Sequence, residues 1–414
     1  MSDVRPFRAL RPRPDLVARV ASPPYDVLST DEARRLAADN PWSFLHVTRA
    51  EIDLPDGTDP HAREVYDRSA ENLERLIRDG ALVRDERPSF SLYELTMGDH
   101  VQRGWVVGAS VDEYERNEIR KHELTRRAKE DDRADHMERL MVNAGPVLLT
   151  YRRRDDLRAL ADEVVRREPL SDFTADDGIR HRVWRLDDPA EIDRVRAAFG
   201  DLDALYVADG HHRSAAAARV RERLRARGVE SPSRPAPWDH FLAVAFPDDE
   251  LRILGYHRVV RDLAGMTPER LLERIAERFE VRPSDATEPA APRRFKLHVG
   301  GRWYELAARP GTFDERDPVR SLDVSILQDN LLAPILGIED PRTDERIDFV
   351  GGIRGMGELE RRCREDAKLA IACHPVTVEQ LMAIADSGAI MPPKSTWFEP
   401  KLRSGLIVRS LRDA

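Results

Sequence analysis

The sequence predicts an α/β protein, of the α+β kind with mixed sheets, in which two or three globular parts share one chain. Its 414 residues exceed the roughly 150 that a single domain usually holds. Between residues 90 and 246, short apolar runs alternate with segments of helical periodicity, as expected where strands and helices alternate. A stretch rich in proline and other turn formers, 226–238, interrupts this pattern and is expected to be a surface loop. A second proline-rich stretch, 283–292, separates a later helix from a hairpin.

The first half of the chain supplies most of the predicted elements. An amphipathic helix is expected at 61–80, where Val65, Leu73 and Leu76 recur at helical spacing before Gly80. A hairpin follows, with strands at 90–97 and 105–111 on either side of a turn at Gly98. The other expected elements are helices at 131–142, 156–167 and 189–199, strands at 146–151, 183–186, 204–208 and 241–246, and an alanine-rich helix after residue 210.

The second half of the chain is predicted to contain a smaller unit of helices and strands. A helix at 268–279 and a hairpin that turns at Gly300 and Gly301 form an α+β element. Beyond it we expect a helix at 324–336 and strands at 347–350 and 369–373. We therefore divide the chain into a main α/β domain at 1–265, a small α+β element at 266–320, and a segment at 321–414 that returns to the functional site.

Composition excludes several classes of protein. Lysine and arginine number 67 against 76 aspartates and glutamates, and a net charge of -9 gives no general attraction to nucleic acid. No apolar run is long enough to cross a bilayer, and the first residues lack the apolar core of a secretory signal. With two cysteines, the chain has no disulfide framework, so we expect a cytoplasmic protein with neither membrane nor nucleic acid as a partner.

The most informative segment runs from Leu205 to Ser214. An apolar run ends at Asp209 and Gly210, and His211, His212 and Arg213 then open the alanine-rich helix. The free amides and the dipole at the start of a helix favour an anion, and an arginine with imidazoles supplies further donors for phosphate oxygens. We interpret the segment as a phosphate-binding turn. The alternative is an ordinary helix start that Asp209 caps, with two solvated histidines.

Two proline-stiffened segments are further candidates. Pro392 and Pro393 precede Lys394, Ser395 and Thr396, which offer an ammonium, two hydroxyls and backbone amides for phosphate or carboxylate. In the other reading, this segment is a surface loop held by the aromatic residues that follow it. The second segment, Ser22–Val27, fixes Tyr25 and Asp26, and Asp26 can accept a proton or serve only as part of a chain reversal.

A charged cluster of Lys121, His122 and Glu123 is the last candidate. Neighbours on a helix point about 100° apart, so one or two of these side chains can face a single site, and a solvated cluster is the alternative. No pair has the spacing of a zinc site, and we expect no structural zinc. Magnesium that enters with ATP or ADP would leave little trace in the sequence. Dinucleotide-binding, P-loop and nucleophile-elbow motifs do not occur.

Taken together, these motifs resemble one large family, the bacterial and archaeal domain-of-unknown-function family numbered ten-fifteen. The resemblance runs nearly end to end. It is carried by Arg5–Leu10, Pro23–Val27, Asn40–Leu45, Lys121–Glu123, Asp209–Arg213 and Pro392–Thr396.

A more distant resemblance concerns the turn alone. Asp209–Arg213 is similar to the Gly-x-His-Arg phosphate-binding turn of ParB-like proteins, sulfiredoxin and the free-serine kinases built on that scaffold. The resemblance implies a strand–turn–helix site for nucleotide phosphates. The turn has no cysteine, so sulfinic-acid reduction is not expected, and without a basic DNA-binding tail a partition role is not expected either.

We expect a small-molecule phosphotransferase that acts on serine or a similar hydroxy acid. Asp209, Gly210, His211, His212 and Arg213 would hold the donor phosphates. Lys394, Ser395 and Thr396 would neutralise the transferring group or the acceptor carboxylate, Asp26 or Glu123 would take the hydroxyl proton, and Tyr25, Lys121 and His122 would contact the substrate. One alternative is a phosphatase in which His211 or His212 becomes transiently phosphorylated during the reaction. Another is a non-catalytic, nucleotide-gated binding protein.

Overall fold

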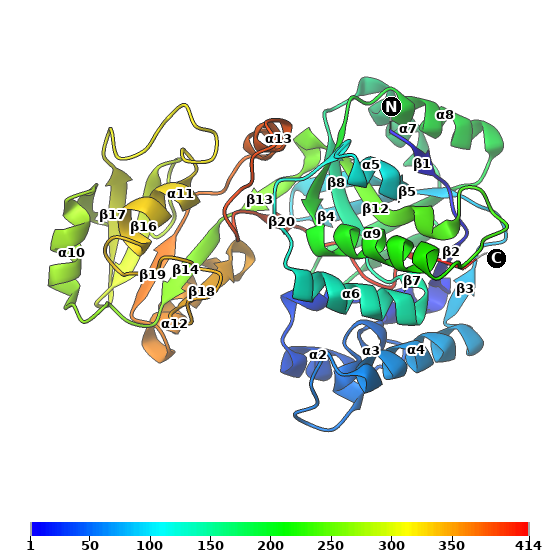
Figure 1. Ribbon diagram of the computed structural model, residues 1–414, viewed down its shortest axis with the longest axis horizontal. Coiled ribbons are helices and arrows are strands. Elements are labelled where there is room, and N and C mark those ends of the chain that lie inside the picture. Colours follow the sequence, from blue (N-terminus) through cyan, green and yellow to red (C-terminus); the bar gives the residue numbers. More distant parts are fainter. Residues whose placement is uncertain (1, 413–414) are drawn as a thin grey trace. The chain divides into compact units, whose positions relative to one another are not determined.

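The computed structural model describes residues 2–412, which form two compact units (Figure 1). The first unit comprises the described residues up to Leu251 together with those from Pro400 onward, and the second unit is Arg252–Glu399. The second unit is therefore an insertion in the sequence of the first. Its two ends are neighbours, because β13 (Arg252–Leu254) pairs antiparallel with β20 (Trp397–Glu399), with Arg252 opposite Glu399.

These boundaries differ in place from the divisions after residues 265 and 320 that we expected from sequence. Strand β14 (Tyr256–Val260) pairs with β18 (Ile347–Gly351) and β19 (Leu369–Ala372), which lie about a hundred residues further along the chain. Such long-range pairing has no local signal in the sequence.

A nine-stranded sheet forms the centre of the first unit. Its order is β6-β11-β8-β12-β5-β4-β10-β9, with β1 also paired to β5. Strand β11 runs parallel to β6, and β12 runs parallel to β8, whereas the other pairs are antiparallel. The predicted class, α/β with mixed sheets, is confirmed. The strands are β1 (Val4–Arg5), β4 (Phe90–Met97), β5 (His100–Ser110), β6 (Ile119–Arg120), β8 (Val147–Tyr151), β9 (Ser171–Thr174), β10 (Arg180–Leu186), β11 (Leu205–Asp209) and β12 (His240–Pro247).

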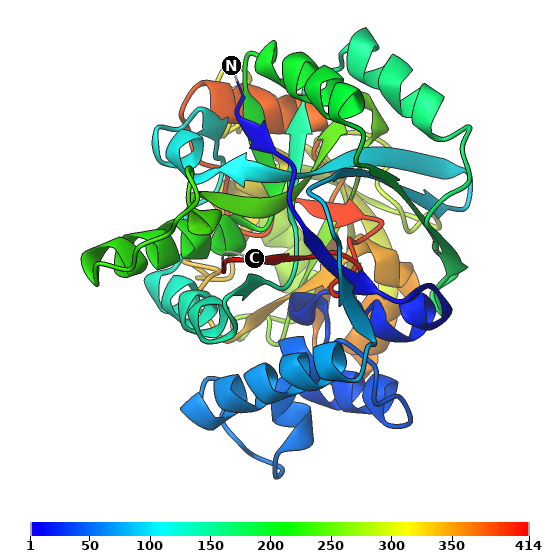
Figure 2. The ribbon, with the colours of Figure 1, turned by 90° about the vertical axis from the view of Figure 1, so that its right-hand side faces the viewer.

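Helices cover this sheet and complete the core. In Figures 1 and 2, α9 (His211–Ala226) lies beside α6 (Arg127–Leu140), and α4 (Arg63–Arg78) packs against α6 in turn. Two more helices, α7 (Asp155–Val164) and α8 (Pro189–Gly200), pack against each other. Every residue of β12 is buried, which explains why this strand reads as a continuous apolar run rather than an alternating one.

A second, four-stranded sheet joins the two ends of the first unit. It has the order β3-β2-β21-β7 and is antiparallel throughout. An isolated antiparallel bridge between Ser22 and Ser404 adds a further link between these ends. The opening segment contains several short helices, of which α2 begins with a capping box formed by Ser29 and Glu32. The elements are β2 (Ala9–Pro12), β3 (Leu82–Arg84), β7 (Val142–Asn143), β21 (Val408–Ser410), α1 (Val17–Val20), α2 (Thr30–Ala37), α3 (Leu45–Thr48) and α5 (Val111–Glu115).

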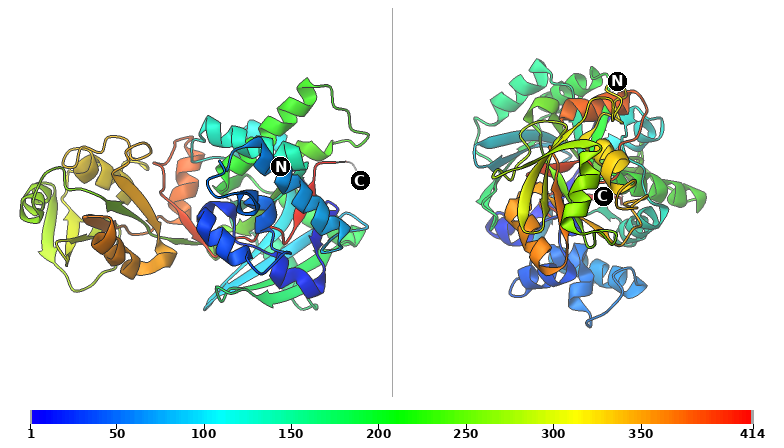
Figure 3. Two further views of the ribbon diagram at one scale, coloured as in Figure 1. Left: turned by 90° about the horizontal axis from the view of Figure 1, so that it is seen from below. Right: turned by 90° about the vertical axis from the view of Figure 1, so that its left-hand side faces the viewer.

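The second unit (Figure 3) is built on a six-stranded sheet. Its order is β15-β17-β16-β19-β14-β18, and all its pairs are antiparallel. The hairpin expected at Gly300 and Gly301 joins β16 (Arg294–Val299) to β17 (Arg302–Ala308). Helices α10 (Pro268–Ala276) and α11 (Asp323–Leu327) contribute to the apolar core on one face of this sheet. Helix α12 (Gly355–Glu365) contributes to a second core on the other face, which the alternate residues of the same strands line. Strand β15 (Phe279–Pro283) and helix α13 (Val378–Asp386) complete the unit.

Two smaller findings bear on the predicted elements. The helix expected at 324–336 ends earlier than predicted. Helix α11 is followed directly by a π-helical segment, Gln328–Leu332, and the helical structure stops at Leu332. Within residues 2–412, no helix combines the length and apolar character that a membrane span requires.

Candidate functional site

Strand direction brings two of the predicted motifs together. Because β6 and β11 are parallel neighbours, with Ile119 opposite Leu205 and Arg120 opposite Tyr206, their carboxyl ends lie at the same edge of the sheet. The segment that follows β6 carries Lys121, His122 and Glu123, and the segment that follows β11 carries the 209–213 turn. The carboxyl ends of parallel strands are a common place for ligand sites in α/β proteins.

Gly210 forms the turn itself. Its φ of 99° is left-handed, and a Cβ there would lie 3.0 Å from Nε and 3.1 Å from Cζ of Arg213. Glycine therefore permits both the backbone angle and the position of the arginine. Helix α9 begins at His211 with Gly210 as its N-cap and no side-chain cap. The alternative in which Asp209 caps the helix is thus wrong. The Arg213 amide donates to the carbonyl oxygen of Gly210 at 2.8 Å, so the amides that keep their capacity to bind an anion are those of His211 and His212.

Arg213 projects from the first turn of α9. Its side chain is 13% exposed, and its guanidinium donates a hydrogen bond to the carbonyl oxygen of Pro146. Nη2 lies 3.9 Å from Oδ1 of Asp209, a long contact for an ion pair. Burial lowers the pKa of Arg213, but the charges of Asp26 and Asp209 outweigh burial and leave this pKa above its ordinary value. The result is a permanently charged, largely buried guanidinium that no carboxylate of the described residues pairs tightly.

His122 and His211 form a buried pair. Their rings meet edge to face, with centroids 4.5 Å apart and an interplanar angle of 88°. Burial lowers the pKa of His122 to about 4 and holds the pKa of His211 well below its usual value, so both rings are neutral at pH 7. Nδ1 of His122 and Nε2 of His211 are buried and have no hydrogen-bond partner among residues 2–412. Since buried polar atoms are nearly always paired, two such nitrogens in contact rings are unusual.

His212 and Glu123 lie beside this pair. Nε2 of His212 accepts a hydrogen bond from the backbone amide of Arg126 at 3.3 Å, and burial lowers the pKa of this imidazole. Oε2 of Glu123 lies 3.7 Å from Nδ1 of His211. The side chain of Glu123 is 38% exposed, so this carboxylate reaches both solvent and the buried histidine.

Tyr25 and Asp26 also belong to this neighbourhood. They lie in a short 3-10 turn, Tyr25–Val27, and Arg133 from α6 stacks over the Tyr25 ring at 4.3 Å. Burial raises the pKa of the Tyr25 phenol, and the charge of Asp26 adds to the effect. Asp26 is exposed, and its charge acts on both Arg213 and His212. The Pro-Pro-Tyr-Asp segment therefore contributes to the same electrostatic environment as the turn.

Sequence reasoning missed two cations of this site, Lys401 and Arg133. Nζ of Lys401 lies 3.0 Å from Oδ2 of Asp209, although 192 residues separate them. The chain is held there by reciprocal backbone hydrogen bonds between Ser22 and Ser404, at 3.0 and 2.9 Å. Burial raises the pKa of Asp209, but Lys401 and Arg213 outweigh it, so the pKa stays well below its usual range. The only signal for Lys401 was its position shortly after the Lys394 segment.

Other predicted residues have different surroundings. Nζ of Lys121 donates to the carbonyl oxygen of Tyr114 at 2.9 Å and lies 4.3 Å from the centre of that ring. Lys121, His122 and Glu123 form an irregular segment after β6, so the spacing of neighbours on a helix does not apply to them.

Lys394, Ser395 and Thr396 lie in the second unit. The carbonyl oxygen of Lys394 accepts from Arg258 at 3.0 Å, and Oγ of Ser395 donates to the carbonyl oxygen of Pro392 at 2.6 Å. That these three residues meet the turn stays a prediction.

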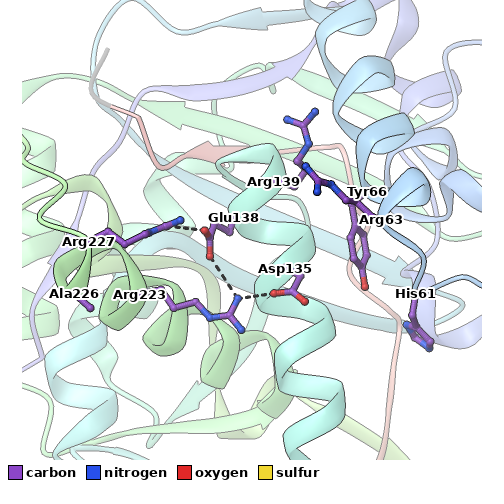
Figure 4. A pocket seen from close by; sticks show the side chains of 9 residues that line it. All are labelled: His61, Arg63, Tyr66, Asp135, Glu138, Arg139, Arg223, Ala226 and Arg227. Carbon is purple, nitrogen blue, oxygen red and sulfur yellow. Dashed lines mark hydrogen bonds and ion pairs between the residues drawn. The ribbon is translucent and has the colours of Figure 1, made fainter.

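An open groove lies at the other end of α9 (Figure 4). It has a volume of about 780 Å³ and is bordered by α4, α6 and the end of α9. Arg223 pairs with Asp135 at 2.5 Å, and Arg227 pairs with Glu138 at 2.6 Å, so its charges largely satisfy one another. With a rise of 1.5 Å per residue, Arg223 lies about 18 Å along the helix from His211. The groove and the turn are therefore separate features. In the described part of the chain, no three histidine, cysteine, aspartate or glutamate side chains are grouped to hold a metal ion.

Comparison with known proteins identifies the family. The model of the family described as "Protein of unknown function (DUF1015)" matches residues 4–325. The chain belongs to this family. The match includes the opening segment, the 121–123 segment and the 209–213 turn, and it ends within the second unit. No curated protein matches the sequence significantly.

Solved structures give low similarities. A mutant free serine kinase in complex with AMP is 14% identical, with a TM-score of 0.37, and the match covers 71% of this chain and 87% of that chain. A conserved hypothetical protein from Pyrococcus furiosus is 13% identical, with a TM-score of 0.36, 74% of this chain and 95% of that chain being covered. SbnI with a C-terminal truncation, from Staphylococcus aureus, is 12% identical, with a TM-score of 0.38 and coverages of 71% and 82%.

Proposed function

We propose that the Asp209–Arg213 turn binds a phosphoryl group and that the protein is a small-molecule phosphotransferase acting on serine or a similar hydroxy acid. The observation that carries this proposal is Arg213, a guanidinium 13% exposed that stands beside the uncapped start of α9. A phosphoryl group supplies several acceptor oxygens, which suit a combination of backbone amides and guanidinium donors.

The surrounding residues support transfer by positioning and charge stabilisation. Phosphoryl transfer requires little covalent chemistry from the protein, so fixed cations and an aligned acceptor hydroxyl supply most of the rate. Glu123 is the better placed proton acceptor, because its carboxylate is partly exposed and lies 3.7 Å from a neutral histidine. Asp26, exposed in its turn, is the second candidate.

The donor and the acceptor-binding residues complete the proposal. ATP or ADP, with Mg²⁺ as the counter-ion of its phosphates, is the proposed donor, and its terminal phosphate would bind the amides of α9 and Arg213. Lys394, Ser395 and Thr396 are proposed to neutralise the transferring group or the acceptor carboxylate, since they offer one ammonium and two hydroxyls.

The test is a phosphorus NMR assay of the full chain with Mg²⁺, serine and either ATP or ADP, and in the reverse direction with phosphoserine. We expect new phosphorus resonances with the wild type and at least about a hundredfold slower turnover in Glu123→Gln, with ligand affinity nearly unchanged. Absence of turnover with every donor would refute the phosphotransferase. Binding without turnover would leave the non-catalytic, nucleotide-gated binding protein.

A histidine-dependent phosphatase is less well supported. A nucleophilic imidazole must present a nitrogen to the phosphorus atom, whereas Nε2 of His211 is buried and Nε2 of His212 accepts the Arg126 amide. An acid-labile phosphoprotein trapped in the wild type but absent from His211→Ala or His212→Ala would favour this alternative over direct transfer.

A further inference from the structure

The carboxylate of Asp209 stands between the two cations of the turn. Its Oδ2 lies 3.0 Å from Nζ of Lys401, and its Oδ1 lies 3.9 Å from Nη2 of Arg213. The three side chains are 31%, 18% and 13% exposed, respectively, so all are partly withdrawn from water. An anion that enters the turn therefore meets one cation, Lys401, that Asp209 already pairs, and a second, Arg213, that Asp209 contacts only at long range.

The other charged groups at the turn are of both signs, and the positive charges of Lys129 and Arg126 act on His212. Burial keeps His122 and His211 neutral, and it also lowers the pKa of His212. Arg133 is held by Asp132 at 2.6 Å. The carboxylates of Asp26 and Glu123 add negative charge nearby.

We propose that Asp209 is an internal counter-anion, that Lys401 is a phosphate-binding residue, and that the turn consequently selects a dianionic phosphoryl group. This inference rests on the proposed function. A tethered carboxylate competes at a high effective concentration, so a ligand with a single negative charge gains little by replacing it. A dianion has twice the Coulomb attraction to each cation and three acceptor oxygens, which suit the Lys401 ammonium, the Arg213 fork and the α9 amides together. It also has twice the repulsion from Asp26 and Glu123, but solvent screens these two carboxylates, one exposed and one partly exposed, more than it screens the largely buried Lys401 and Arg213.

The substrate class follows from this competition. The turn would bind the terminal phosphoryl group of a phosphomonoester or of a nucleotide. It would discriminate against phosphodiesters and simple carboxylates, which have one negative charge. On binding, the Lys401 ammonium would exchange its contact with Asp209 for a contact with the phosphoryl oxygens.

The experiment is isothermal titration of the full chain at pH 8 with methyl phosphate, a dianion there, and with dimethyl phosphate, a monoanion. We expect the wild type to bind methyl phosphate at least about 10-fold more tightly. Lys401→Met is expected to bind methyl phosphate about 10-fold more weakly, the effect of losing one charge-assisted hydrogen bond, whereas Lys401→Arg stays within a few-fold of the wild type. The exposed Lys368, changed to Met, is the matched control and leaves both affinities unaltered.

The Asp209→Asn variant is expected to change affinity in the opposite direction to Lys401→Met. Removal of the internal anion is expected to tighten dimethyl phosphate binding and so to reduce the selectivity for the dianion. If this variant does not fold, the Lys401→Met and Lys401→Arg pair decides the matter alone. Equal affinity of the wild type for both probes, or unchanged methyl phosphate binding by Lys401→Met, overturns the inference but leaves the phosphate site intact. A wild type that binds neither probe refutes the proposed function itself.

Discussion

Replacing Arg213 by glutamine tests the site most severely with one substitution. In the structure the guanidinium donates to the Pro146 carbonyl oxygen, and the nearest carboxylate oxygen among residues 2–412 lies 3.9 Å away. Most of its donors are therefore available to a ligand. Two charge-assisted hydrogen bonds to a phosphoryl group, at about 1.5 kcal/mol each, amount to roughly 3 kcal/mol, or a Kd about a hundredfold higher in Arg213→Gln.

The assay is isothermal titration with methyl phosphate and with ADP, accompanied by thermal unfolding of the same samples. Glutamine loses the bond to Pro146 but also removes a buried charge, so we expect the Tm to change by only a few degrees. The exposed Arg19, changed to glutamine, is the control for general loss of positive charge. A folded Arg213→Gln protein whose Kd stays within threefold of the wild type would show that the phosphoryl group binds elsewhere.

Three further outcomes follow from the structure. The buried, neutral His122 has a pKa of about 4, against 6.5 in the unfolded chain, so the unfolded state binds more protons than the folded state below pH 6.5. As the pH falls from 6.5 to 4, this residue should lower the free energy of unfolding by about 1.4 kcal/mol per pH unit. Urea titrations should show a shallower dependence of this free energy on pH in His122→Asn, and an equally steep dependence would contradict the prediction. Gly210→Ala, at a φ of 99°, should lower that free energy by about 1–2 kcal/mol and also weaken phosphate binding, whereas Gly357→Ala, with no atom within 4 Å of the added Cβ, should not alter binding. Replacing residues 252–399 by a short glycine-serine linker should leave a folded first unit, because Arg252 and Glu399 are paired neighbours; retained methyl phosphate binding would show that Lys394–Thr396 is not needed for it.

Features with a local cause were predictable from the sequence. The strand–turn–helix at Leu205–Arg213 follows from an apolar run, a glycine and an alanine-rich segment, and the structure has these elements as β11 and α9. The hairpins around Gly98 and Gly300–Gly301 were likewise marked by turn residues between strand-like runs.

Features that depend on distant pairing were not predictable. His122 contacts His211 because β6 and β11 are parallel neighbours, and nothing within Lys121–Glu123 indicates that strand direction. Lys401 reaches Asp209 because the Ser22–Ser404 bridge fixes the C-terminal segment beside the first unit's opening segment. Residues this far apart in sequence are brought together by tertiary structure alone, whatever their local composition.

The boundaries between the two units were not predictable either, because they too depend on pairing between distant strands. The proline-rich stretch at 283–292 suits a boundary by composition, yet it connects β15 to β16 within one sheet. The actual division at Leu251 and Pro400 falls at a strand pair, β13 with β20, which carries no unusual composition.

The central claim is that the Asp209–Arg213 turn holds a phosphoryl group. A crystal structure of the full chain soaked with ADP and phosphoserine tests it most directly. The account predicts a phosphorus atom whose oxygens lie within hydrogen-bond distance of the Arg213 guanidinium and of the amides of His211 and His212. A phosphoryl group bound only at another place, with these donors still facing the protein or water, would contradict it.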